Sequence, residues 1–150
     1  PIMPRLFLVK TAEVTVPIQC RQCEDAPCAN VCPNKCITNR NGVVSINKSS
    51  CIGCKTCLMA CPVGAIDLVP EFNNGKKVVQ HGLKVTDDGK LCFKYKMVGN
   101  KCDLCNGREN GPACVEVCPT NAFNIVKSDE LNESIKEKRK QSALRLTNIG

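Results

Sequence analysis

One cysteine motif occurs three times along this chain, and no other feature constrains the fold as strongly. Each copy consists of Cys-x2-Cys, a gap of two to eight residues, and then Cys-x3-Cys-Pro. The copies are formed by Cys20, Cys23, Cys28 and Cys32, by Cys51, Cys54, Cys57 and Cys61, and by Cys102, Cys105, Cys114 and Cys118. The similarity continues after each proline, where a small residue precedes a large apolar one. Such a repeat predicts that each copy forms one recurring structural unit.

The second copy matches at every position the Cys-x2-Cys-x2-Cys-x3-Cys-Pro run of two-cluster bacterial iron-sulfur proteins. In that pattern three cysteines of a run hold one [4Fe-4S] cluster and the last cysteine ligates the other cluster. For this chain the pattern predicts one ligand set of Cys20, Cys23, Cys28 and Cys61, and a second of Cys51, Cys54, Cys57 and Cys32. The third copy predicts a further metal site at Cys102, Cys105, Cys114 and Cys118. The crossed ligands would lock the first two copies into one module.

Disulfides and zinc are the alternatives to iron-sulfur clusters for these cysteines. The 14 cysteines could form seven disulfides, but secreted disulfide scaffolds are not built from three repeats of Cys-x2-Cys with Cys-Pro. A structural zinc site is the stronger alternative for the third copy, because Cys102-x2-Cys105 and Cys114-x3-Cys118 alone resemble a four-thiolate zinc knuckle.

Three residues outside the motifs have simpler interpretations. Cys36 stands where the other copies have Ala65 and Ala122, so we expect it to be a small buried filler, and the same holds for Cys92. His81 precedes a glycine in a loop-like stretch and is interpreted as a solvated loop residue.

The composition fits a chain whose core is filled partly by clusters. Aromatic residues make up 3% of the chain, so the side chains that usually fill a core are scarce, and bulky clusters that cross-link the chain would replace them. The formal charge is +7. Three clusters of net charge about 2− each would reduce it to about +1. We therefore expect no nucleic-acid partner.

The sequence shows neither a membrane signal nor a catalytic motif. It has no run of about 18 apolar residues and no charged-then-apolar leader, so we expect no membrane span and a reducing, cytoplasmic location. No nucleophile-base pair, phosphate loop or paired carboxylates are recognisable, which favours a non-catalytic electron carrier. Because the chain begins at Pro1 without a methionine, we expect that the natural protein extends further upstream.

The expected fold class is α+β, in five segments. Residues 1–19 are an extended lead-in, 20–66 a bacterial ferredoxin-like module for two [4Fe-4S] clusters, 67–101 a β-hairpin insertion, 102–126 a partial ferredoxin-like half-module, and 127–150 a C-terminal helical tail. Turns are predicted at Asn41-Gly42, Asn73-Asn74-Gly75 and Asp87-Asp88-Gly89. The tail is expected to be helical from Ser128 to Leu146, since Ser128 is a suitable N-cap and acidic residues precede basic ones. We expect it to dock on a partner subunit; a solvated helix is the alternative.

The segment from Cys20 to Pro33, together with the Lys101–Cys105 segment and Cys118-Pro119, resembles the iron-sulfur subunits of molybdenum or tungsten formate dehydrogenases and their hydrogenase partners. These subunits are four-cluster polyferredoxins, and the resemblance covers roughly residues 5–126. It implies a subunit that relays single electrons between a hydrogenase and a formate dehydrogenase, as in formate hydrogenlyase or hydrogen-dependent CO2 reductase. A free soluble polyferredoxin that shuttles electrons between enzymes is the alternative. A zinc-stabilised interaction module is the third hypothesis.

The chain departs from this family in one respect. The family has an additional Cys-x2-Cys-x2-Cys-x3-Cys run upstream of the position of Pro1. The resemblance implies that Cys102, Cys105 and Cys114 take their fourth thiolate from that run, while Cys118 serves a fourth cluster. The expected cofactors are therefore two [4Fe-4S] clusters in the first module, a third at the last copy, and a fourth if an upstream run exists. The expected partners are redox subunits, other copies of the chain, or a homologue.

Overall fold

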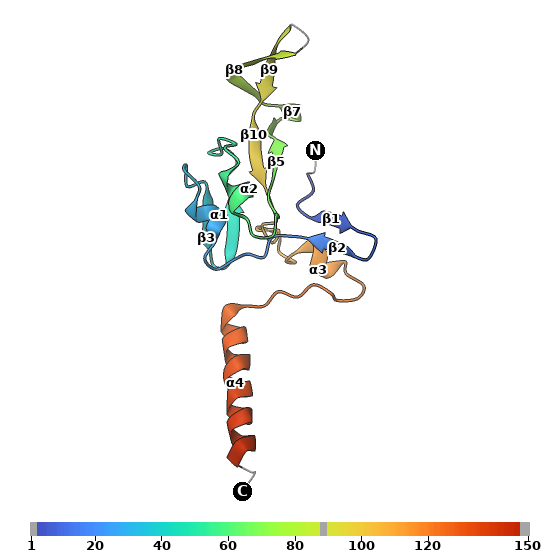
Figure 1. The fold of residues 1–150 in the computed structure, drawn as a ribbon, viewed down its shortest axis with the longest axis vertical. Coiled ribbons are helices and arrows are strands. Elements are labelled where there is room, and N and C mark those ends of the chain that lie inside the picture. Colours follow the sequence, from blue (N-terminus) through green and yellow to red (C-terminus); the bar gives the residue numbers. More distant parts are fainter. Residues whose placement is uncertain (1–2, 88–89, 148–150) are drawn as a thin grey trace. The chain divides into compact units, whose positions relative to one another are not determined.

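The structure is a computed structural model that describes residues 3–87 and 90–147. It comprises two compact units, residues 1–107 and residues 108–150. Short helices and two-stranded antiparallel sheets build the first unit, while α3 and α4 lie in the second (Figure 1). This mixture of helices and strands agrees with the expected α+β class. The boundary between the units falls inside the third cysteine motif.

The N-terminal segment is a hairpin and not a single extended lead-in. Strand β1 (Phe7–Lys10) pairs antiparallel with β2 (Thr15–Ile18). The Thr11 hydroxyl oxygen accepts a hydrogen bond from the N–H of Val14 at 2.9 Å and donates one to the Val14 carbonyl oxygen at 3.1 Å. The segment has no Asn-Gly or Gly-containing turn, so the local bonding of a threonine was the only signal for this reversal.

The first two cysteine motifs flank the hairpin that the sequence predicts. The elements are α1 (Pro27–Asn30), β3 (Ile37–Arg40), β4 (Val43–Ile46) and α2 (Thr56–Ala60), with β3 and β4 paired antiparallel. Asn41 and Gly42 have φ angles of 52° and 76°. A type I′ turn requires positive φ at both central residues, so the predicted turn is confirmed.

The insertion contains three strand pairs where one hairpin was expected. Strand β5 (Asp67–Pro70) pairs with β10 (Met97–Asn100), β6 (Phe72–Asn73) with β7 (Lys76–Lys77), and β8 (Val79–Asp87) with β9 (Lys90–Tyr95). The turn at Asn74-Gly75 is confirmed by φ angles of 48° and 77°. The turn predicted at Asp87-Asp88-Gly89 lies partly outside the described residues. His81 lies in β8, so its assignment to a loop was wrong.

The second unit contains α3 (Ala113–Glu116) and α4 (Ser128–Thr147). Helix α4 confirms the helix that was predicted from Ser128 onward. Asp129 and Glu130 lie in its first turn and Arg145 in its last, which is the favourable arrangement for the helix dipole. Among the residues described, no helix combines the length and apolar character needed to cross a membrane.

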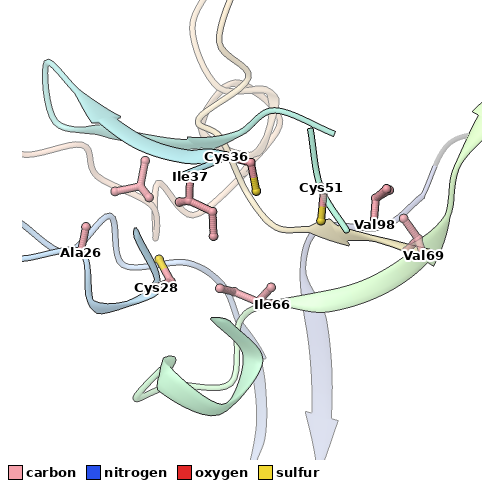
Figure 2. Close-up of a cluster of buried hydrophobic side chains, with 9 residues drawn as sticks. Ala26, Cys28, Cys36, Ile37, Cys51, Ile66, Val69 and Val98 are labelled. Atoms are coloured by element: carbon pink, nitrogen blue, oxygen red, sulfur yellow. The ribbon is translucent and has the colours of Figure 1, made fainter. Parts of the chain in front are cut away.

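The core of the first unit is small and contains cysteines among its aliphatic side chains. Its buried members include Cys28, Cys36 and Cys51. In Figure 2, Ile37 and Ile66 lie between Cys28 and Cys51. These two isoleucines occupy equivalent positions in the first and second copies of the motif. The core is therefore organised around the cysteines of both copies.

Candidate metal centre

The sequence repeat is also a repeat of backbone conformation. The residue just before the second cysteine of each copy has positive φ: 51° at Gln22, 68° at Gly53 and 54° at Leu104. In the first and third copies the N–H of this residue points at the first cysteine, with N–Sγ distances of 3.5 Å to Cys20 and Cys102. A left-handed residue bends the loop sharply, so the two cysteines of each Cys-x2-Cys are brought to one side of it.

The third cysteine of each copy occupies the same place on a short helix. Cys28, Cys57 and Cys114 are each the second residue of their helix, α1, α2 and α3 respectively. The preceding N-cap residue is left-handed in the first two copies, at Ala26 and Lys55. In the third copy the N-cap is extended. The wide gap of that copy thus changes the approach to the helix while keeping its cysteine in register.

A second turn follows each Cys-Pro pair. Lys35, Gly64 and Asn121, three residues after the fourth cysteine, all have positive φ. In the second and third copies this turn aims a backbone N–H at the fourth cysteine, from Ala65 to Cys61 Sγ and from Ala122 to Cys118 Sγ, each at 3.3 Å. Hydrogen bonds to cysteine sulfurs are one way in which a protein tunes the reduction potential of a cluster.

Two cavities bring together cysteines from both of the first two copies. One is lined by Cys20, Cys23, Cys28 and Cys61. The other is lined by Cys32, Cys51, Cys54 and Cys57, and also by Cys36. Each cavity thus contains the first three cysteines of one copy and the fourth cysteine of the other. This grouping is the one that the crossed ligand pattern requires.

Both cavities combine thiols with apolar side chains. Each is lined by four thiols of the expected sets together with apolar side chains, including Val44 and Ile66 in the first and Ile37 and Ile46 in the second. Within residues 3–87 and 90–147, no three histidine, cysteine or acidic side chains converge closely enough to hold one metal ion. Thiolates around an apolar cavity are the donors that iron-sulfur clusters use.

In the first cavity, neighbouring thiols shift the pKa of Cys28. Burial raises the pKa of Cys28, and the neighbouring Cys20 and Cys61 raise it further, whereas Lys101 lowers it. Cys61 is distant from Cys28 in sequence but close enough in space to affect its pKa. Because iron binds the thiolate, loading this cavity must release the protons of these thiols.

The thiols of the second cavity also shift one another's pKa values. Burial raises the pKa of Cys57 to about 11, and the nearby Cys51 and Cys54 add to this effect. The pKa of Cys54 is lowered chiefly by the Thr56 hydroxyl, which donates to Cys54 Sγ at 3.3 Å. Cys32 also acts on Cys54, as expected for thiols that line one cavity.

Cys36 is buried, as the filler interpretation requires, but it also contacts a predicted ligand. Its Sγ lies 3.3 Å from Cys32 Sγ. Burial, followed by the hydrogen bond with Cys32, raises the pKa of Cys36 to about 12. The pKa of Cys32 is lowered, because this bond and nearby backbone N–H groups outweigh the effect of burial. Cys32 is the fourth cysteine of its motif and remains the predicted iron ligand, with Cys36 as its hydrogen-bond partner.

The third motif is divided between the two compact units. Cys102 and Cys105 belong to residues 1–107, and Cys114 and Cys118 belong to residues 108–150. Burial raises the pKa of Cys102. The pKa of Cys118 is lowered, first by a hydrogen bond with the Thr120 hydroxyl. Within each half a turn of the other copies recurs, with positive φ at Leu104 before Cys105 and at Asn121 after Cys118.

The structure adds residues that the motif pattern did not single out. The N–H of Gly99, in β10, points at Cys51 Sγ at 3.4 Å, so β10 is part of the second cavity wall. Gln22 and Lys101 both hydrogen-bond to the carbonyl oxygen of Cys102. A lysine and a glutamine adjacent to motif cysteines were the only sequence signal for these contacts.

Among the glycines that the structure describes, Gly53 is the one whose replacement is expected to be most harmful. Its φ is +68°, and a Cβ there would lie 2.5 Å from the carbonyl oxygen of Met97 in β10. Left-handed φ alone costs an alanine about 1–2 kcal/mol. We expect Gly53→Ala to lower the temperature at which the loaded protein loses its clusters, because it also pushes β10 away from the second cavity. Visible absorbance during heating measures this loss.

Gly64→Ala is the matched control, since Gly64 has a φ of +63° and a Cβ added there would meet nothing within 4 Å. This variant has the same unfavourable left-handed φ, but its added methyl group meets no neighbouring atom. A decrease for Gly53→Ala no larger than that for Gly64→Ala would contradict the assigned role of the Met97 contact.

Comparison with known proteins shows the family of this chain. Two models described as 4Fe-4S dicluster domain match residues 11–81 and 50–122. The chain is similar to the electron transport protein HydN of Escherichia coli K12, with 45% identity over 144 residues, 95% of this chain and 76% of the relative. It is 36% identical to hydrogenase-4 component A of the same organism over 165 residues, 98% of this chain and 78% of the relative. It is 37% identical to formate hydrogenlyase subunit 2 of that organism over 147 residues, 91% of this chain and 72% of the relative.

Proposed function

This chain belongs to the family of 4Fe-4S dicluster proteins that includes HydN, hydrogenase-4 component A and formate hydrogenlyase subunit 2, and we propose that it relays single electrons between the redox subunits of a larger complex. The observation that carries this proposal is the pair of cavities, each lined by the first three cysteines of one motif and the fourth cysteine of the other. A [4Fe-4S] cluster, when bound, accepts or donates one electron without substantial atomic rearrangement. The role of the protein is then to set the spacing, the burial and the reduction potentials of the clusters.

The lining of the two cavities supports the predicted ligand sets. We assign Cys20, Cys23, Cys28 and Cys61 to one cluster, and Cys51, Cys54, Cys57 and Cys32 to the other. Residues 102–126 are proposed as a half-module whose Cys102, Cys105, Cys114 and Cys118 serve a third iron-sulfur site. The match of a 4Fe-4S dicluster domain to residues 50–122 supports iron over the zinc alternative, because it includes all four of these cysteines.

The partners are proposed from the names of the relatives. Those names include an electron transport protein, a hydrogenase component and a formate hydrogenlyase subunit. We infer that this chain serves a hydrogenase, a formate dehydrogenase or a similar enzyme in a reducing, cytoplasmic compartment, and that it catalyses no bond change itself. Helix α4 is the proposed contact, since Leu131 and Leu146 are at least half exposed on it.

Anaerobic affinity purification of the tagged chain from its native host tests this function. We expect co-purification of a large oxidoreductase, together with about four iron and four sulfide atoms per occupied site. A chain that ends at Lys127 is the control, because it should keep the clusters of the first module and recover less of the oxidoreductase. A chain recovered alone with its iron would favour the free shuttle, and zinc without sulfide would contradict electron transfer.

A further inference from the structure

Lys101 is a buried lysine next to the candidate clusters. It follows β10 directly and is 4% exposed. Its ammonium group donates to the carbonyl oxygens of Val44 and Cys102, the latter at 2.7 Å. Within residues 3–87 and 90–147, no carboxylate lies within salt-bridge distance of this ammonium. A buried cation without an anionic partner is costly, and carbonyl dipoles offset only part of that cost.

A cluster in the neighbouring cavity would supply the missing negative charge. Val44, whose carbonyl oxygen accepts from Lys101, lines the cavity of Cys20, Cys23, Cys28 and Cys61. The same ammonium acts electrostatically on the thiols of both Cys28 and Cys102. Its hydrogen bond to the carbonyl oxygen of Cys102 places it at the start of the third motif.

Gln22 connects Val44 and Cys102 through two hydrogen bonds. This residue lies between Cys20 and Cys23. Its Oε1 accepts from the N–H of Val44 at 2.8 Å, and its Nε2 donates to the carbonyl oxygen of Cys102 at 3.0 Å. Gln22 and Lys101 thus bind the same two backbone positions. The loop of the first motif is fastened to the start of the third, with the ammonium held at their junction.

We propose that Lys101 is the counter-cation of the cluster in the Cys20 cavity, and that it raises the reduction potential of that cluster. Reduction adds one electron from the redox partner to a cluster that is already negative, and no bond to the protein forms or breaks. A fixed positive charge stabilises the reduced form more than the oxidised form, because the reduced form carries one more negative charge. Lys101 is a tuning residue and not a ligand. This inference rests on the proposed function.

Replacement of the charge tests the proposal. In Lys101→Gln a hydrogen-bond donor remains but the charge is lost, so we expect at least one cluster midpoint to become more negative, with about a tenfold smaller reduction equilibrium constant, or about 59 mV for one electron. Lys101→Arg should leave the midpoints near those of the natural protein. Lys48→Gln is the control for net charge, since Lys48 lies on the same unit, is half-buried, and bonds to Asn100 Oδ1 at 3.4 Å. Redox titration followed by electron paramagnetic resonance gives the midpoints.

The variants separate an effect of charge from an effect of packing. Unmoved midpoints in Lys101→Gln, or an equal shift in Lys48→Gln or Lys101→Arg, overturn the proposal. If Lys101→Gln loses iron while Lys101→Arg keeps it, the charge is needed for assembly and the proposal stands. Loss of iron in both variants overturns it, because packing would then be the role of Lys101. A natural protein without iron and sulfide would refute the proposed function itself, which separates the two failures.

Discussion

Replacing Cys61 by serine is expected to remove about four iron atoms per chain, and to remove them from the cavity of Cys20, Cys23 and Cys28. Cys61 belongs by sequence to the second motif, yet it lines the cavity of the first. A serine hydroxyl is a much poorer iron ligand than a thiolate at neutral pH. The cluster with three remaining thiolates is therefore expected to be lost. Iron and sulfide analysis with electron paramagnetic resonance measures the change.

Double variants identify which cavity is affected. Cys61→Ser combined with Cys28→Ser should lose no more iron than Cys61→Ser alone, because both residues serve one cluster. Cys61→Ser combined with Cys57→Ser should lose about four further iron atoms. The reverse result, in which Cys61 and Cys57 act as one site, would refute the crossed assignment.

Cys36→Ala is the matched control for removing a cysteine. Cys36 lines the second cavity, but alanine occupies the corresponding positions 65 and 122 of the other copies. We expect this variant to retain its full iron content. Loss of a cluster would show that Cys36, and not Cys32, is the ligand.

Removal of iron with a chelator is expected to unfold the first unit. Among the described residues ten apolar side chains are buried, and three of them are Cys28, Cys36 and Cys51. The largest fully buried apolar side chains are Val44 and Val98. A core of this size contributes little hydrophobic stabilisation by itself, so thiolate bonds to the clusters supply the cross-links that hold β3, β4, β5 and β10 in place.

Hydrogen exchange measured before and after chelation tests this. We expect the amides of β3, β4, β5 and β10 to lose nearly all of their protection, while exchange in α4 is unchanged. Helix α4 is the internal control because it belongs to the other unit. An iron-free chain that keeps its protection in these strands would show that the side chains alone stabilise the core.

The sequence predicted local structure correctly where it contained residues that favour one type of turn or helix end. Asn41-Gly42 and Asn74-Gly75 predicted their turns, because both residues of each pair tolerate positive φ. The Ser128 helix followed from its N-cap and charge order. The reversal between β1 and β2 was missed, since Thr11 forms its turn through side-chain bonds that many threonines do not make.

The sequence by itself determined the donor set, the repeat and the likeness to 4Fe-4S proteins, because ligation chemistry depends on residue type and on short spacings along the chain. Only the tertiary structure decided what surrounds the cavities. The pairing of β5 with β10 spans the whole insertion, and it places Gly99 against Cys51 and Lys101 against Val44. Contacts at such sequence separation depend on how the chain closes on itself, and no local pattern encodes that closure.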